Sequence, residues 1–128
     1  FLDAHTAALL KAYPTAGKSW GAARKGLNLF LRDVCYNTAL ADELGLPRSG
    51  AAWTKALQWL EVPLDKDVAK ALGGHIKDTS RWTGIKNLTP EVSKAYQKAA
   101  MIIARKNNTA RVHLDLAYWR QVAKRNGA

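Results

Sequence analysis

The chain has 128 residues, of which 48% are hydrophobic and 23% charged, values that are typical of a folded globular domain and not of a disordered segment. Its 20 Lys and Arg residues outnumber its 10 Asp and Glu residues, which gives a formal charge of +10. Such an excess indicates a polyanionic partner, most often nucleic acid. A membrane partner is not expected, because no apolar run approaches the roughly 20 residues that a span needs, and no signal-peptide pattern is visible.

The single cysteine, Cys35, rules out a disulfide within the chain and fits a reducing, intracellular compartment, either the cytoplasm or the nucleoid. Within a helical segment we expect this cysteine to be a small buried hydrophobe. Because the chain opens at Phe1, we expect residues 1–128 to be a single helical domain that is a fragment or a trimmed form of a longer protein.

Alanine, leucine and lysine dominate the sequence, and no sustained alternation of apolar and polar residues indicates a strand. The expected fold class is therefore all-α, a single compact bundle of about six helices. In chain order the helices are expected at about Asp3–Tyr13, Ser19–Leu44 and Ala51–Leu60, from Pro63 to the Gly73–Gly74 break, from Pro90 to Asn107, and from the recapping Thr109 to about Lys124. Thr89 and Pro90 give the clearest helix start, an N-cap followed by proline at the first helical position.

Apolar residues at helical spacing predict the faces that pack in the core. In the second helix Leu27, Leu31, Val34 and Thr38 keep such a spacing, and Phe30 widens the stripe. The third helix carries one on Trp53, Leu57 and Leu60, and the fifth on Val92, Tyr96, Ala99 and Ile103.

The basic excess is unevenly distributed. Four basic residues and no acid lie between Gly17 and Arg32, and Val92–Ala128 holds eight basic residues and one acid, Asp115, for a net +7. Basic side chains with tryptophans nearby suit phosphate contacts supported by base stacking. The alternatives are a merely solvated helical surface for the charges and core packing for each tryptophan.

The candidate nucleic-acid contacts are Lys18, Trp20, Arg24, Lys25, Lys66, Lys70, Arg81, Trp82, Lys86, Arg105, Lys106 and Arg111. No metal site or cofactor is expected, because the three histidines lie far apart and neither C-x-x-C nor H-E-x-x-H occurs. The segment AGKSWG resembles only the tail of a phosphate-binding loop, and no serine can be assigned to a catalytic triad from the sequence.

The segment PLDKDVAKAL, from Pro63 to Leu72, resembles the P-V-D-T-H-V segment of the helix-hairpin-helix DNA glycosylases. By that resemblance Asp65 would be the catalytic aspartate at a helix start, and Asp67 stands where the family usually has histidine. The segment WGAARKGLNLFL is similar to the helix after the family's hairpin, which would place Gly21, Arg24 and Lys25 near the DNA backbone. The helices of Pro90–Arg120 resemble those that complete its catalytic lobe. PTAGKSWG stands in the place of the hairpin itself.

Two interpretations of Asp65 remain open. As a catalytic carboxylate it would stabilise the positive charge that develops on a sugar when the bond to a flipped base breaks, or activate water. As a structural residue it would cap the short helix, where the helix dipole favours a negative charge. For Asp115 we expect an ion pair with Arg111, one turn earlier on the same helix, rather than a second catalytic role.

The sequence therefore supports two main functions. One is a DNA-repair hydrolase, a base-excision N-glycosylase that uses Asp65. The other is a non-catalytic basic helical module that binds DNA or RNA, and a third, weaker option is a scaffold whose basic face meets an acidic protein. Nucleic acid, DNA in preference to RNA, is the partner that the first two share.

Overall fold

The computed structural model describes residues 1–13, 19–76 and 81–125. Over these residues the chain forms seven α-helices and three short 3₁₀ helices and no strand, which confirms the all-α prediction. The α-helices are α1 Leu2–Ala12, α2 Trp20–Tyr36, α3 Thr38–Glu43, α4 Gly50–Trp59, α5 Lys66–Leu72, α6 Pro90–Lys106 and α7 Leu114–Arg125. The 3₁₀ helices are η1 Gly73–His75, η3 Ile85–Asn87 and η4 Arg111–His113.

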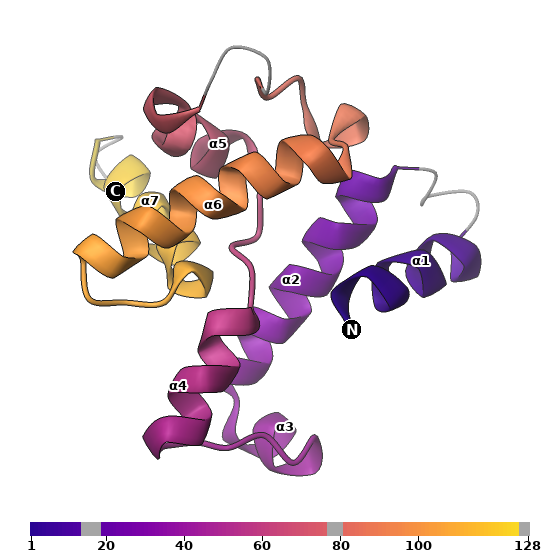
Figure 1. Cartoon of the computed structure of the whole chain (residues 1–128), viewed down its shortest axis with the longest axis vertical. Helices are drawn as coiled ribbons and strands as arrows, with labels where there is room; N and C mark the ends of the chain where they lie inside the picture. Colours follow the sequence, from indigo (N-terminus) through magenta and orange to yellow (C-terminus); the bar gives the residue numbers. More distant parts are fainter. Residues whose placement is uncertain (14–18, 77–80, 126–128) are drawn as a thin grey trace.

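The core lies where α5, α6 and α7 meet. Its buried residues come from α5, α6, α7 and the two segments that precede α5 and α6: Val62, Leu64, Val68, Ala69, Leu72, Leu88, Tyr96, Ala100, Ala104 and Leu114. Figure 1 shows α6 crossing the molecule, α1 lying along the outer side of α2, and α3 and α4 at one end, away from α5. No residue of α4 is fully buried, so this end is less tightly packed than the core.

Several predicted helix boundaries are confirmed, and others are wrong for a local reason. The Thr89 hydroxyl accepts a hydrogen bond from the Val92 amide at 3.3 Å, as expected of an N-cap. The single helix expected over Ser19–Leu44 is broken at Asn37, whose backbone is extended and whose side chain accepts from Leu40 N at 3.1 Å to start α3. Asparagine favours such a cap over a helix interior, because its side chain competes for backbone amides.

The last two predicted starts shift as well. The fourth helix begins at Lys66, because Pro63 and Leu64 are buried in an extended strand-like segment before it. The final helix begins at Leu114, after η4, so the predicted recapping at Thr109 is wrong.

The predicted apolar faces are confirmed in part. Leu27, Leu31 and Val34 are buried along α2, but Phe30 is 51% exposed and does not widen the stripe. In α6 Tyr96 and Ala99 are buried, and Val92 and Ile103 pack against the core at its edge. In and just after α4 the residues Trp53, Leu57 and Leu60 are only half-buried.

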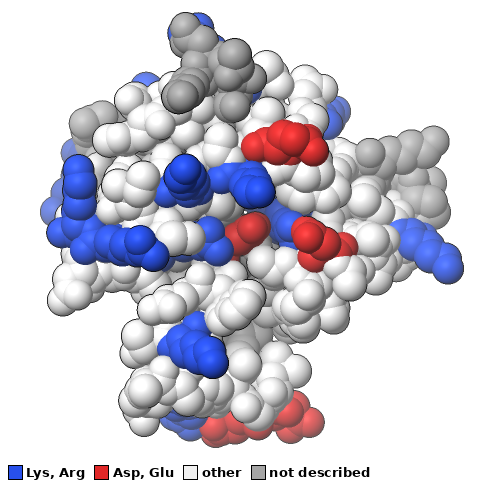
Figure 2. All heavy atoms as spheres, viewed as in Figure 1, with Lys and Arg blue, Asp and Glu red and all other residues white. Residues whose placement is uncertain are grey.

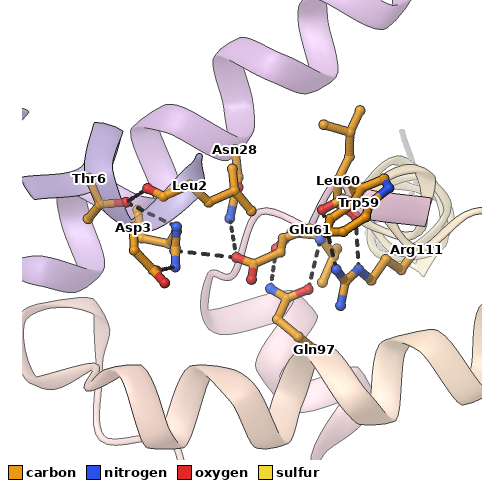
Figure 3. Close-up of polar contacts among 11 residues, drawn as sticks. Leu2, Asp3, Thr6, Asn28, Trp59, Leu60, Glu61, Gln97 and Arg111 are labelled. Atoms are coloured by element: carbon orange, nitrogen blue, oxygen red, sulfur yellow. Dashed lines mark hydrogen bonds and ion pairs between the residues drawn. The ribbon is translucent and has the colours of Figure 1, made fainter. Parts of the chain in front are cut away.

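The extended segment between α4 and α5 runs through the centre of the molecule, and side chains satisfy its backbone (Figure 3). The Gln97 amide of α6 makes both hydrogen bonds of Val62: its Oε1 accepts from Val62 N at 3.0 Å and its Nε2 donates to Val62 O at 2.8 Å. Arg111 donates to the Leu60 carbonyl at 2.8 Å and to the Trp59 carbonyl at 3.4 Å. Two side chains thus satisfy the amide and carbonyl of Val62 and the carbonyls of Trp59 and Leu60.

An ion-pair network centred on the buried Arg24 ties α1 and α2 to the same segment. Arg24, 7% exposed, forms an ion pair with Asp3 and donates to the Thr6 hydroxyl at 3.1 Å. Its Nε lies 3.4 Å from Glu61 Oε2, a Coulombic contact without hydrogen-bond geometry. The Asn28 amide donates to the same Glu61 oxygen at 3.2 Å. One arginine therefore joins three parts of the chain.

We predict that Gln97→Leu lowers the free energy of unfolding by about 2 to 4 kcal/mol, because it leaves the buried amide and carbonyl of Val62 without partners. Urea unfolding followed by circular dichroism measures the change. The control is Gln121→Leu, the same substitution at an exposed position of α7. Equal stability of the two variants would contradict the role given to Gln97.

Candidate nucleic-acid interface

Three of the residues expected near nucleic acid are buried or half-buried: Trp20, Gly21 and Arg24. The Arg24 guanidinium is buried in its ion pairs, with the Trp20 ring 5.0 Å away in a cation–π contact, and the half-buried Trp20 packs against the core. Gly21 is buried as well: a Cβ added there would lie 2.2 Å from the Ile85 carbonyl oxygen, so its small size serves the packing of α2 on η3. The described contacts of Trp20, Gly21 and Arg24 are thus made within the protein. Lys18 lies outside the described residues.

Asp65 has the contacts of a helix cap. Its Oδ1 accepts from the backbone amides of Asp67 at 3.0 Å and Val68 at 2.9 Å, which makes it the N-cap of α5. Its Oδ2 lies 3.7 Å from Lys25 Nζ, and both side chains are about one-third exposed. Both carboxylate oxygens are therefore engaged within the protein.

The exposed basic residues of α6 form a stripe, which we call the α6 stripe: Lys94, Lys98 and Arg105. All three are exposed, and their spacing places them on one face of the helix. Lys106 is exposed beside them. On the side of the molecule seen in Figure 2, Lys and Arg side chains gather over α6, and a further basic side chain lies over α4.

The α6 stripe ends in a groove between α4 and the end of α6. This basic groove has a volume of about 890 Å³, and its lining includes Lys55, Trp59, Met101, Arg105, Arg111 and His113. None of the described residues that line it is acidic. Trp59 is 71% exposed, although it is one of the largest apolar side chains of the protein. Cations and an exposed aromatic ring therefore share one concave surface.

A second, smaller groove of about 450 Å³ gathers four other predicted contacts. Lys66 and Lys70 of α5 line it together with Arg81 and Trp82. The Trp82 ring packs edge-on against Tyr96, with ring centroids 6.3 Å apart, and its amide donates to the Tyr96 hydroxyl at 3.0 Å. The other predicted contact of this region, Lys86, is exposed on η3 but does not line the groove. Asp65 lines neither of the two grooves.

The predicted ion pair between Asp115 and Arg111 is wrong. Asp115, buried at the start of α7, pairs with Arg32 of α2, which also pairs with Asp33 at 2.6 Å. Arg111 instead turns toward the carbonyls that end α4, where burial lowers its pKa and the charge of Glu61 opposes that effect. Burial raises the pKa of Asp115 in spite of the Arg32 charge beside it.

Next to this pair, Tyr36 of α2 and His113 of η4 share a hydrogen bond. Burial lowers the pKa of His113, and the charge of Asp115 opposes the shift. Burial also raises the pKa of the Tyr36 hydroxyl, and it raises that of the half-buried Cys35 thiol, whose Sγ lies 3.2 Å from the Leu31 carbonyl oxygen. The Tyr36–His113 hydrogen bond joins α2 to η4, and the Arg32–Asp115 ion pair joins α2 to α7.

Among residues 1–13, 19–76 and 81–125, no group of three His, Cys, Asp or Glu side chains is placed to hold a metal ion. Nor is any helix in this described part both long enough and apolar enough to cross a membrane.

Four residues of the candidate interface were not predicted as contacts: Lys55, Trp59, Lys94 and Lys98. The spacing of Lys94, Lys98 and Arg105 along one helix was the available signal. The role of Lys55 and Trp59 depends on the packing of α4 beside η4, a contact between segments that are far apart in the sequence.

In comparisons with known proteins, no family model, curated protein or solved structure matches the chain. The resemblance to helix-hairpin-helix DNA glycosylases stays a prediction that rests on the quoted sequence segments.

We predict that Asp65→Ala costs about 1 to 2 kcal/mol of stability, because it removes a cap that accepts two backbone amides. Asp65→Asn should cost less than half as much, since asparagine caps nearly as well and the partly exposed Lys25 pair contributes less than about 1 kcal/mol. Thermal and urea unfolding measure both. An Asp65→Ala variant as stable as the wild type, or more so, would contradict the cap and favour a carboxylate that is kept for chemistry.

We also predict that the protein loses stability as the pH falls below the ordinary His pKa of 6.5. The lowered pKa of folded His113 means that the unfolded chain takes up its proton first, so unfolding is favoured between 6.5 and the folded pKa. His113→Gln should flatten the profile of unfolding free energy against pH in this window. His75→Gln, at an exposed position, is the matched control. A profile that is the same with and without His113 would refute this assignment.

Proposed function

We propose that the protein is a non-catalytic helical module that binds DNA or RNA along the α6 stripe and the basic groove. The observation that carries the proposal is the continuity of these two surfaces, because Arg105 belongs to both. From Lys94 to Arg105 the stripe covers roughly 16 Å, at about 1.5 Å per residue. Measured along the axis of a duplex, that length corresponds to about five phosphates of one strand at a rise of roughly 3.4 Å each.

The distribution of acids supports the same surface. Of the acids labelled in Figure 3, Asp3 and Glu61 are paired with Arg24. Elsewhere Asp65 is paired with Lys25, and Asp115 with Arg32. The exposed cations of α6 have no ion pair with a described residue. Glu91, in the first turn of α6, is exposed as well, but from Lys94 to Lys106 the charged residues of this helix are all basic. A polyanion can reach these residues, with counterion release as the driving force.

Base excision gains no support from the surroundings of Asp65. A catalytic carboxylate must face a pocket that holds the flipped base, whereas this one caps α5 and lines neither groove. We therefore propose binding without catalysis.

We predict that the affinity for a labelled oligonucleotide falls linearly with salt on logarithmic axes, with about one unit of slope for each phosphate contact. Lys98→Ala and Arg105→Ala should each weaken binding and reduce the slope by about one unit. Fluorescence anisotropy over a salt series measures both quantities. Lys11→Ala, an exposed lysine at the end of α1, is the control for charge alone. An affinity that does not change with salt, or equal losses in all three variants, would refute this interface.

An acidic protein partner would show the same salt dependence. A competition experiment separates the two, because in the proposed function an excess of unlabelled nucleic acid displaces the probe and an excess of an acidic polypeptide such as polyglutamate does so poorly. Displacement by polyglutamate at equal charge concentration would instead indicate a protein-binding surface.

A further inference from the structure

We propose, on the basis of the function above, that the basic groove selects single-stranded nucleic acid and stacks one unpaired base on the ring of Trp59. The α6 stripe by itself contacts only phosphates, which single strands and duplexes share. The groove adds an aromatic surface, and this surface distinguishes the two.

Trp59 is presented to solvent from a fixed position. It is the last residue of α4, and its backbone carbonyl, together with that of Leu60, accepts hydrogen bonds from Arg111. The two side chains come from segments far apart in the sequence and lie next to each other at this helix end (Figure 3). A ring that is 71% exposed on an anchored backbone is already in place to stack, so binding costs little ordering.

Cations surround this ring on both walls of the groove. Lys55 precedes Trp59 by one turn of α4, so the two lie on the same face of that helix. Arg105 comes from α6 on the other wall. Arg111 uses Nε and Nη2 on the α4 carbonyls, and its Nη1 makes no hydrogen bond to a described residue. A base on Trp59 would thus have the flanking phosphates within reach of three cations.

This combination suits a single strand because the faces of its bases are accessible. In a duplex each base is stacked between its neighbours and must be flipped out at a cost before an aromatic ring can reach its face. Proteins that bind single strands without sequence preference combine a positive groove with aromatic side chains in this way. A volume of about 890 Å³ falls in the range of pockets that hold a ligand the size of a nucleotide.

A second copy of the chain is the other occupant that an exposed tryptophan suggests. It would bring another net charge of +10 toward a groove whose described lining includes cations and no acid. Repulsion between like charges therefore favours a polyanion.

The test compares three labelled probes: an oligothymidylate, an abasic strand with the same number of phosphates, and a duplex of equal length. We expect the wild type to bind the oligothymidylate more tightly than either of the others. Trp59→Ala should weaken oligothymidylate binding by about tenfold and leave the affinity for the abasic strand unchanged. Trp59→Phe should recover most of the loss, and Trp119→Ala, at a 67% exposed position of α7 that does not line the groove, should change nothing.

The outcomes separate the two proposals. If the wild type binds the probes in a salt-dependent way but Trp59→Ala loses equally on all of them, or on none, stacking is refuted and the binding function stands. Binding of the duplex in preference to the oligothymidylate refutes the single-strand selectivity. If no probe binds at low salt, the proposed function itself fails. Quenching of tryptophan emission by oligothymidylate, lost in the folded Trp59→Phe variant, is a second readout that does not depend on the alanine variant.

Discussion

The fold depends on one extended segment, Leu60–Leu64, that runs between helices where no neighbouring strand can satisfy its backbone. A buried amide or carbonyl without a hydrogen-bond partner lowers the free energy of unfolding by about 1 to 3 kcal/mol, which is more than a typical hydrogen bond contributes. Gln97 removes this penalty at Val62 with a donor and an acceptor on one amide group. The apolar side chains of Val62 and Leu64 can then join the core with α5 and α6. Without that pairing, the core would have to form around unsatisfied backbone.

The same constraint builds the surface that we propose as functional. Arg111 donates hydrogen bonds to the carbonyls at the end of α4, and this contact holds η4 next to α4. Residues of both elements then line the basic groove. The charge of Arg111 is thereby held at the groove. The charge of Arg24, in contrast, is held inside the protein by its three partners, Asp3, Glu61 and Thr6. Both arginines were predicted as nucleic-acid contacts, but Arg111 lies at the basic groove and Arg24 is buried.

The sequence was a good guide to the features that local chemistry determines. The start of α6 at Thr89 and Pro90, the cap of α5 at Asp65 and the buried faces of α2 and α6 follow from residue type and helical spacing. It was a poor guide to the partners of charged residues. Asp115 pairs with Arg32, 83 positions away, and not with the arginine one turn earlier. Such a pair depends on which helices meet, and no periodicity in the chain encodes that.

The candidate interface was only partly anticipated from the sequence. The excess of basic residues in the last third of the chain directs attention to α6, and the spacing of these residues would have added Lys98 to Arg105. Trp59 could not be found in this way, because in the sequence it looks like any apolar residue at the end of a helix. Its 71% exposure becomes visible only when α4 is placed at the edge of the molecule, outside the core (Figure 1).

The most direct test of the account is to map the binding surface by NMR, following backbone amide chemical shifts of the labelled protein during titration with an oligothymidylate. We expect the largest shifts in residues 54–60, at the end of α4 and just after it, along the exposed face of α6 from Lys94 to Arg105, and in residues 108–113, with α1 unaffected. Shifts that are concentrated on α5 and around Asp65 would contradict the account and favour a site at the helix start that resembles the glycosylase motif. No shift at low salt would contradict nucleic-acid binding altogether.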